Sequence, residues 1–456
     1  MIKTAVAWPV RYDASYRPAI DEPYWDRRLE TMDPEERNVV ILAKLQAQIA
    51  WCWNRSPFYR EKWQAAGFEP GDLRTLEDFS RLPVLHKREL REEQAAHPPF
   101  GRYTCDEPST WLRIHGTSGT TGKPTGFVIS RDDWSRIAEA QARVMWGMGF
   151  RPSDTLFVAS LFSLYMGSWA ALLGAERLGM TCFPYGAGIP GMTKQALTWL
   201  REVKPNSFYG TPSYALRLAE VALAEGLDPR ELGLRKMFFS GEPGAGVPSV
   251  KAQLEETFNA KVFDSGSTAE MTPWITDGEC AERRGMHLWQ DIVYAEVCDP
   301  QTFRPVAFGS EGTPVYTHLE RTSMPMIRFA AGDLTTWTNE PCSCGRTYPR
   351  LPRGIYGRID DQLTVRGENV FPSSIEEVLR GEGFRDEYRV VVTRKGALDE
   401  LTVRVEALER DRDRVRLGEA LRRVVGLRCE VDFVEVGSLP RSELKSRRVD
   451  DLRPKG

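Results

Sequence analysis

The chain has 456 residues, of which 41% are hydrophobic and 27% charged, enough to bury the core of a large domain and of a smaller one. Its 61 basic and 64 acidic residues give a formal net charge of -3, which offers no electrostatic reason to expect a nucleic acid or an anionic membrane as partner. Eight cysteines in a chain of this length do not form the dense pattern of a small secreted disulfide scaffold, so we expect reduced thiols.

The amino terminus does not have the charged and then apolar layout of a signal peptide. The most apolar later stretch, residues 161–173, is too short to span a bilayer. We therefore expect a cytoplasmic protein. We also expect a homodimer.

In chain order, residues 34–66 have apolar side chains at helical spacing and predict a helical amino-terminal subdomain. After Thr110, strand-like runs such as DTLFVAS, SFYG, KMFFS and KVFDS alternate with helix-like segments such as QALTWLREV. This alternation predicts an α/β domain with a largely parallel sheet covered by helices.

Beyond Gly357 a hairpin, a helix at 373–379, two strands, a charged helix at 411–424 and a last strand predict a small α+β domain. We predict domains at 1–356 and 363–456, with a hinge at 357–362.

The segment from His115 to Gly126 packs four glycines, four threonines and a serine around Lys123. Glycines let a backbone approach a ligand closely, while hydroxyls and an ammonium donate to phosphate oxygens, so the segment is typical of a phosphate cradle. It is not the Walker pattern, because Pro124 follows the lysine and would disrupt the helix that the Walker motif requires. The competing interpretation is a flexible polar loop.

The string S-G-T-T-G-x-P-x-G in this segment resembles the phosphate loop of the acyl-adenylate-forming superfamily: acyl-CoA synthetases, peptide-synthetase adenylation domains and luciferases. More narrowly, the chain is similar to the phenylacetate-CoA ligase family over almost its whole length, through NRSPFY at 54–59, LGAERLG at 173–179, YGTP at 209–212 and SGEP at 240–243. The resemblance implies an ATP-dependent ligase that joins an aromatic acid to coenzyme A through an acyl-adenylate, with Mg²⁺ as cofactor. Two alternatives remain, an enzyme that delivers the acid to a carrier protein and a non-catalytic nucleotide-binding regulator.

The resemblance implies nucleotide contacts from the phosphate loop, from the strand end DSG and from the turn SGEP, for which an ordinary tight turn is the alternative. The residues concerned are Thr117, Ser118, Gly119, Thr120, Thr121, Gly122, Lys123, Ser240, Gly241, Glu242, Pro243, Asp264, Ser265 and Gly266.

The segment 265–270 resembles the family motif Y-G-x-T-E, whose threonine and glutamate touch the phosphate and its magnesium. The resemblance thereby implies these roles for Thr268 and Glu270, although a serine replaces the tyrosine and Ala269 adds a residue before the glutamate. Asp333 matches the aspartate that accepts hydrogen bonds from the ribose hydroxyls, while Ala330 and Ala331 replace an Arg-Thr pair.

Residues 357–369 resemble the family hinge and the loop after it. The resemblance implies that Arg358 contacts ribose or phosphate and that Asp360 changes its dihedral angles as the small domain rotates. It further implies that Lys445 supplies the cation between the carboxylate and the α-phosphate. The loop residues are Gly367, Glu368 and Asn369.

Cys280, His287, Cys342 and Cys344 offer three thiolates and an imidazole, a set suited to tetrahedral Zn²⁺. The phenylacetate-CoA ligase branch has a similar C-x-C-G-R pattern, and some members hold a structural zinc there. We predict a structural zinc, with unliganded thiols as the alternative.

The acid pocket should be lined by the segments around 162–167, 185–188 and 209–212, whose aromatic, small and apolar residues suit a flat ring, although core packing accounts for much of the same composition. The predicted substrate residues are Phe162, Tyr165, Gly188, Tyr209, Gly210, Thr211 and Pro212. At the head of the cradle, His115 could contact the acyl or the thiol side, or could be a spacer.

Overall fold

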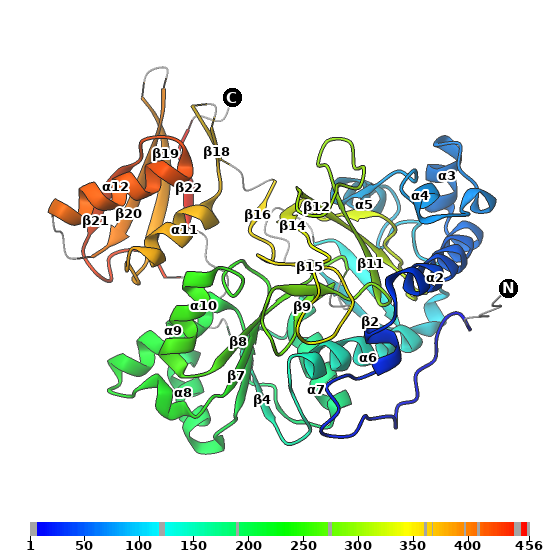
Figure 1. The fold of residues 1–456 in the computed structure, drawn as a ribbon, viewed down its shortest axis with the longest axis horizontal. Coiled ribbons are helices and arrows are strands. Elements are labelled where there is room, and N and C mark those ends of the chain that lie inside the picture. The colour runs from blue at the N-terminus through cyan, green and yellow to red at the C-terminus, as the bar shows by residue number, and fades with distance from the viewer. Residues whose placement is uncertain are drawn as a thin grey trace.

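The computed structural model describes residues 7–117, 124–187, 191–271, 276–359, 363–366, 368–395, 398–407, 411–441 and 448–453. Figure 1 shows a large body that carries the amino terminus and a smaller unit, coloured orange, that carries the carboxyl terminus. The body divides into amino-terminal helices, a long mixed sheet and a second sheet.

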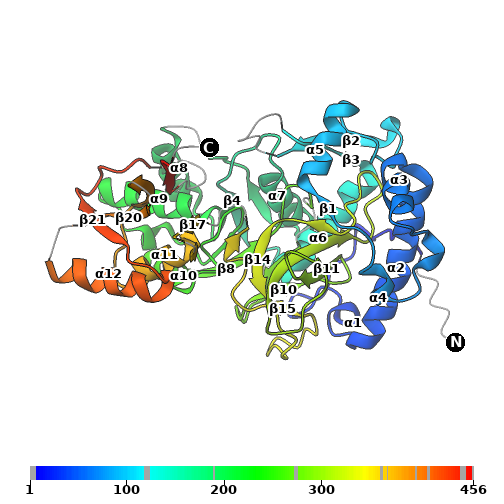
Figure 2. The ribbon, with the colours of Figure 1, turned by 90° about the horizontal axis from the view of Figure 1, so that it is seen from above.

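The amino-terminal helices pack along one side of the body (Figure 2). Their bounds are α1 (Arg27–Glu30), α2 (Pro34–Arg55), α3 (Pro57–Ala65), α4 (Leu76–Phe79) and α5 (Lys87–Ala96), with short 3₁₀ turns η1 (Pro70–Asp72) and η2 (Pro108–Thr110). α2 begins where Asp33 accepts hydrogen bonds from the first-turn amides and Pro34 takes the first helical position. Ile41, Leu45 and Ile49 of its buried face lie in the main core, as the helical spacing predicts.

The long sheet has eight strands in the order β15-β10-β9-β8-β7-β6-β4-β5. Five of them are parallel: β4 (Thr155–Val158), β5 (Thr181–Phe183), β6 (Ser207–Gly210), β7 (Lys236–Phe239) and β8 (Lys261–Gly266). Three antiparallel strands extend it: β9 (Asp277–Glu279), β10 (Met286–Leu288) and β15 (Arg350–Leu351). The predicted helix-covered, largely parallel sheet is confirmed.

Helices cover both faces of the parallel strands. They are α6 (Arg131–Gly147), α7 (Gly167–Leu178), α8 (Met192–Val203), α9 (Pro212–Ala224) and α10 (Pro248–Phe258), with the turn η3 (Pro229–Leu232). Leu156 and Val158 of β4 belong to the core shared with α6 and α7, while Phe157 between them packs with α8 and α9. Because successive side chains of a strand point to opposite faces, a strand buried on both sides is apolar without interruption.

The second sheet follows the order β1-β13-β12-β14-β16, and β11 also pairs with β12. The strands are β1 (Leu85–His86), β11 (Val293–Cys298), β12 (Glu311–His318), β13 (Phe329–Ala330), β14 (Asp333–Thr336) and β16 (Gly357–Arg358). A separate hairpin joins β2 (Trp111–Gly116) to β3 (Gly126–Ser130) on either side of the cradle segment.

The smaller unit has a core of its own, formed by residues between Leu363 and Val431. Its elements are β17 (Leu363–Val365), β18 (Glu368–Val370), α11 (Pro372–Gly381), β19 (Tyr388–Lys395), β20 (Leu398–Glu406), α12 (Asp411–Val425), β21 (Glu430–Val434) and β22 (Val449–Asp451). Its sheet order is β21-β20-β19-β22, and β22 pairs in parallel with β19. The two-part α/β and α+β architecture is as predicted, while the boundary at 357–362 stays a prediction, because residues 360–362 lie outside the described chain.

Within the described ranges, no helix combines the length and the apolar character that crossing a membrane requires.

Candidate active site

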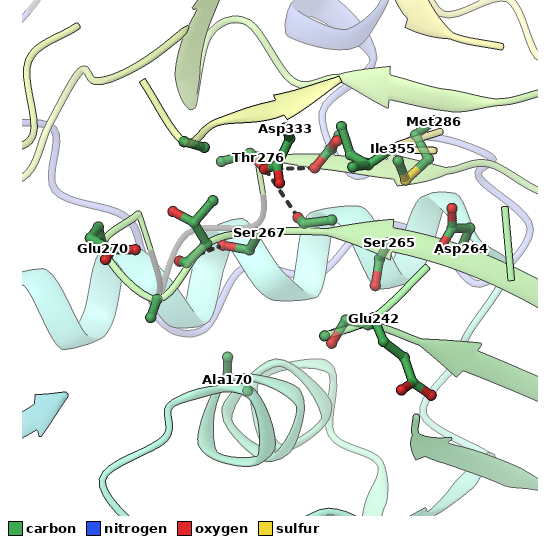
Figure 3. Close-up of a pocket in the computed structure, with 18 of the residues that line it drawn as sticks. Ala170, Glu242, Asp264, Ser265, Ser267, Glu270, Thr276, Met286, Asp333 and Ile355 are labelled. Atoms are coloured by element: carbon green, nitrogen blue, oxygen red, sulfur yellow. Dashed lines mark hydrogen bonds between the residues drawn. The ribbon is translucent and has the colours of Figure 1, made fainter. Parts of the chain in front are cut away.

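A cavity of about 250 Å³ opens where the parallel strands of the long sheet end. Residues that follow β7 and β8 line it, together with residues from β14, β16 and the first turns of α5 and α7. Figure 3 shows Glu270 at one end of the cavity, Asp264 toward the other, Asp333 on one side and Ala170 of α7 opposite. The carboxyl ends of parallel strands are the usual place for a ligand in an open α/β sheet.

The turn after β7 is anchored to α9 by Glu242. The carboxylate of Glu242 accepts hydrogen bonds from the amide of Ser213, at 2.8 Å, and from the Ser213 hydroxyl. Ser240, at the start of the turn, shares a 2.7 Å hydrogen bond with the hydroxyl of Tyr209. All four predicted residues, Ser240 to Pro243, line the cavity, and the Glu242 side chain itself stabilises the turn.

Two buried carboxyl groups lie on the floor of the cavity. Burial and the nearby Glu279 raise the pKa of Asp264 to about 8, and burial raises the pKa of Asp277 to about 7. A Cβ at Gly266 would stand 2.2 Å from the Asp277 carboxylate, so only glycine lets this carboxyl pack against β8. Both carboxyls are partly protonated near neutral pH, so they can donate as well as accept hydrogen bonds.

Glu270 and Lys87 form an ion pair across the cavity, with 2.8 Å between Nζ and Oε1. The Glu270 side chain is 2% exposed and that of Lys87 37% exposed. The Lys87 ammonium therefore balances a buried carboxylate at this end of the cavity, and a bound cation could take its place. Thr268 lines the cavity beside Glu270, and its hydroxyl accepts from the amide of Met271.

The predicted ribose residue, Asp333, is 8% exposed and lies on β14 directly opposite Arg358 of β16. The Arg358 guanidinium donates to the Asp333 carboxylate at 3.1 Å. Ala331 also lines the cavity, whereas Ala330 pairs with β12 as part of β13. The structure thus brings Asp333 and Arg358 to the same wall as the turn residues.

Tyrosine hydroxyls gather at the α7 end of the cavity. Tyr165 and Tyr209 both line it and both hydrogen-bond with Ser240, and burial raises the pKa of each phenol, so both stay protonated. Gln141 of α6 and Ala170 of α7 complete this end.

Several predicted substrate residues have other positions. Phe162 packs edge-on against Trp169, 5.0 Å between ring centroids, and lines a second cavity rather than the first. Thr211 caps α9 by accepting from the Tyr214 amide, Pro212 occupies the first position of that helix, and Gly210 ends β6; none of the three lines the first cavity. They form the strand-to-helix turn that supports Tyr209.

At the head of the cradle, His115 is buried and lies outside the lining of the first cavity, whereas Thr117 belongs to it. His115 Nδ1 is 3.2 Å from the carbonyl oxygen of Leu164, and burial lowers the pKa of the ring. The neutral ring therefore donates from Nδ1.

Other predicted site residues lie outside the described part of the chain: Ser118, Gly119, Thr120, Thr121, Gly122, Lys123, Gly188, Asp360, Gly367 and Lys445, together with the Asn369 side chain. Glu368 is described and begins β18 in the smaller unit, with an exposed side chain.

Sequence reasoning missed Lys87, Gln141 and Asp277 in the cavity. Lys87 begins a helix in a charged run, so nothing in its local pattern distinguishes it from a solvated lysine. Gln141 lies inside α6, where the spacing of apolar residues indicates only that the position is buried. Asp277 comes after the segment 265–270, which departs from the family motif, so no motif position points to it.

The four predicted metal ligands form one cluster. The ligand atoms of Cys280, His287, Cys342 and Cys344 all lie within 4.8 Å of one another. Cys344 Sγ is 3.4 Å from His287 Nε2 and accepts a hydrogen bond from the Arg346 amide. Backbone amides that donate to sulfur are typical of thiolate ligands, so the donor set fits a tetrahedral zinc ion.

The chain is similar to proteins of known structure and activity. Residues 35–316 match the AMP-binding enzyme family, and residues 367–453 match the AMP-binding enzyme C-terminal domain. A phenylacetate-coenzyme A ligase of Thermus thermophilus is 35% identical over 449 residues, covering 93% of this chain and 98% of that protein. Its counterpart in Escherichia coli is 33% identical over 437 residues, covering 93% and 97%.

Among solved structures, a 2-hydroxyisobutyryl-CoA ligase in the postadenylation state is 52% identical, with a TM-score of 0.93, and the match covers 97% of this chain and 95% of that one. The same ligase in the thioesterification state, with CoA, has a TM-score of 0.77 at 53% identity, over 98% and 96% of the chains. The chain belongs to the AMP-binding enzyme family, in its phenylacetate-coenzyme A ligase branch.

Proposed function

We propose that this adenylate-forming acid–coenzyme A ligase activates a small carboxylic acid that carries a hydroxyl group. The observation that carries the proposal is the hydroxyl cluster of Tyr165, Tyr209 and Ser240 at the α7 end of the first cavity. A site with buried hydrogen-bonding groups favours a substrate that can pair with them and rejects the analogue that lacks the polar group.

The 2-hydroxyisobutyryl-CoA ligase, at 52% identity, supports the same choice. An aromatic acid, which the sequence predicts, is the second candidate. It is supported by phenylacetate-coenzyme A ligases that are 30–35% identical over more than nine-tenths of the chain.

For the first half-reaction, we propose that the carboxylate attacks the α-phosphorus of ATP and that pyrophosphate leaves. Asp333 would accept from the ribose hydroxyls while Arg358 holds its carboxylate in place at 3.1 Å. Asp264 and the turn from Ser240 to Pro243 would surround the adenine. The protein groups orient the reactants and neutralise charge, and no covalent protein nucleophile is needed.

At the phosphate end, Lys87 and Glu270 are the described charged pair. Glu270, a buried carboxylate, would hold Mg²⁺, which when bound neutralises phosphate charge. Lys87, half exposed at the mouth, would then turn its ammonium from the carboxylate to a phosphate oxygen. Thr268 would add a hydroxyl donor.

For the second half-reaction, the CoA thiol attacks the acyl carbon and AMP leaves. We propose that the smaller unit rotates about Asp360 between the two steps, so that Lys445 is withdrawn and the thiol gains access. The two states of the 2-hydroxyisobutyryl-CoA ligase support a rotation, because the chain superposes on one far better than on the other.

Lys445→Ala should depress acyl-adenylate formation by about a hundredfold or more, because the variant removes the cation between carboxylate and α-phosphate. The reaction of preformed acyl-adenylate with CoA should change far less. The measurement is pyrophosphate release in one assay and acyl-CoA formation from synthetic adenylate in the other. Equal losses in both assays would contradict the assignment of Lys445.

The acid is tested with a panel of 2-hydroxyisobutyrate, isobutyrate, phenylacetate and benzoate, each assayed for acyl-CoA formation. We expect kcat/KM for the hydroxy acid to exceed that for isobutyrate by about tenfold or more, because the deoxy acid cannot add a hydrogen bond to the hydroxyl cluster. Tyr165→Phe should reduce this ratio, while Tyr185→Phe, which removes a phenol outside the first cavity, should preserve it. A higher kcat/KM for phenylacetate than for 2-hydroxyisobutyrate would establish the aromatic candidate instead.

A further inference from the structure

Two buried side chains outside the lining of the first cavity contact the backbone that carries the Glu270 carboxylate. They are His318, the last residue of β12, and Arg321, in the turn that follows it, and both are 0% exposed. Glu320 lies between them in sequence, but its side chain pairs with Lys44 of α2 instead. The end of β12 therefore directs two polar side chains to the segment 270–271.

The His318 ring bridges two backbone groups, and these groups fix which nitrogen carries the proton. Nδ1 lies 2.9 Å from the Met326 amide nitrogen, and a backbone N–H can only donate, so Nδ1 is the acceptor. The proton is therefore on Nε2, which donates to the Met271 carbonyl oxygen at 3.1 Å. Because one neutral ring satisfies both groups, the imidazole is held in a single orientation against Met271.

The Arg321 guanidinium joins the same segment to the strand that leaves the phosphate cradle. Nη1 lies 3.4 Å from the Glu270 carbonyl oxygen, and Nη2 donates to the Val128 carbonyl oxygen of β3 at 3.1 Å. The donors of a planar guanidinium have a fixed spacing, so one side chain sets the distance between these two pieces of backbone. Arg321 thereby fixes Glu270 relative to β3.

Two helices in turn fix the segment that carries Arg321. The carboxylate of Asp133, in α6, accepts from the amides of Thr322 and Ser323, at 3.0 and 2.9 Å. From α2, the side-chain amide of Gln48 donates to the Arg321 carbonyl oxygen at 2.9 Å. These buried hydrogen bonds join distant parts of the chain, so the segment is a rigid support for the side chains it carries.

The altered motif at 265–270 gives a reason why Glu270 needs such a support. Relative to the family motif, Ala269 adds a residue before Glu270, so motif spacing alone does not place the carboxylate. The carbonyl of Glu270 and that of the next residue are the two that the side chains after β12 hold. Fixing both carbonyls fixes the direction of the Cα–Cβ bond of Glu270, and with it the reach of the carboxylate.

We propose that His318 and Arg321 are positioning residues that aim the Glu270 carboxylate at the magnesium ion of bound ATP. They act through the backbone and do not line the cavity in which ATP would bind. The inference rests on the proposed role of Glu270 as the Mg²⁺ ligand. Groups that orient a metal ligand typically change metal affinity by about ten- to a hundredfold when they are removed.

His318→Leu fills the space of the ring with neither a donor nor an acceptor. We expect the Mg²⁺ concentration for half-maximal pyrophosphate release to rise by about tenfold or more, while KM for the acid stays close to that of the unaltered enzyme. His318→Gln should recover most of this loss, because an amide offers one donor and one acceptor as the neutral ring does. Arg321→Lys, which can reach only one of the two carbonyls, should also raise the Mg²⁺ requirement and serves if His318→Leu does not fold.

The matched control is Gln290→Leu. The Gln290 side chain is buried and also binds one amide and one carbonyl, both of Ala295, at 3.1 and 2.9 Å, but it lies outside the first cavity. The control removes the same kinds of hydrogen bond, so it should lower Tm without changing the Mg²⁺ requirement. The positioning role is refuted if His318→Leu leaves the Mg²⁺ requirement unchanged, or raises it no more than Gln290→Leu does.

Calorimetry of ATP binding with and without Mg²⁺ gives a readout that needs no turnover. The gain in ATP affinity on adding Mg²⁺ should be smaller in His318→Leu and unaltered in Gln290→Leu. In a Glu270→Gln background, His318→Leu should reduce the gain little further, because its effect passes through that carboxylate. Fully additive effects of the two changes would contradict the proposal.

The same titrations separate this inference from the proposed function. If Glu270→Gln left the gain in affinity unchanged, the Mg²⁺ role of Glu270 would be wrong, and the positioning role with it. If Glu270→Gln reduced the gain while His318→Leu and Arg321→Lys did not, only the positioning role would be wrong.

Discussion

Glu270→Gln should lower the rate of acyl-adenylate formation by about a hundredfold or more, because it removes the charge that would hold Mg²⁺ beside the departing phosphates. Glutamine has nearly the same shape, so the change tests charge rather than packing. The Glu270 side chain is 2% exposed and pairs with Lys87, which makes it the buried anionic group at that end of the first cavity. The rate is followed as pyrophosphate release over a range of Mg²⁺ concentrations.

The matched control is Glu320→Gln. Glu320 is also buried and also pairs with a lysine, Lys44, at 2.5 Å, yet it does not line the first cavity. This control should reduce stability and leave the rate per folded molecule largely intact. If both glutamine variants released pyrophosphate at the same rate, Glu270 would have no special part in the chemistry.

Cys342→Ser should cause the largest loss of stability, because it removes one of four ligands from the proposed zinc site. Structural zinc contributes folding free energy directly, and thiolates left without metal repel one another. The segment that carries Cys342 and Cys344 also contacts the chain around α1. Tyr24 donates to the Cys344 carbonyl oxygen, and Arg346 pairs with the buried Glu30. We therefore expect loss of the metal to loosen the packing of α1 as well as the cluster itself.

The measurements are metal content by mass spectrometry and Tm with and without a chelator. The unaltered protein should contain one zinc per chain and lose thermal stability with chelator, whereas Cys342→Ser should contain little zinc and have a lower Tm that chelator does not change. Cys105→Ser is the control, because Cys105 is as buried as Cys342 and lies outside the cluster. Unaltered protein purified without zinc, or a Tm indifferent to chelator, would remove the zinc proposal.

Predictions from the local sequence were confirmed for the helices and strands whose formation depends on the spacing of nearby apolar residues. The helical spacing in residues 34–66 predicted α2 and α3, and the apolar runs predicted β4, β6, β7 and β8. The resemblance implied nucleotide contacts from both the turn at Ser240 and the segment at Asp264, and both line the first cavity, where carboxyl ends of parallel strands meet. The cysteine and histidine set was predicted from its donor types.

Side-chain proximity between distant segments was not predictable in the same way. Lys87 meets Glu270 only because β1 joins β13 in the second sheet, which brings the start of α5 to the end of β8. Phe162, a predicted substrate residue, lines the second cavity and not the first, since the direction of a loop side chain depends on the helices packed around it.

The sequence by itself determined the α/β alternation, the small carboxyl-terminal α+β unit, the family and the order of its motifs, because backbone preference, burial period and motif spacing are local properties. Only the tertiary structure decided which polar groups share a cavity: the hydroxyls of Tyr165, Tyr209 and Ser240, and the pair of Lys87 and Glu270. These groupings arise from sheet order and helix packing over long chain separations, which no local pattern encodes.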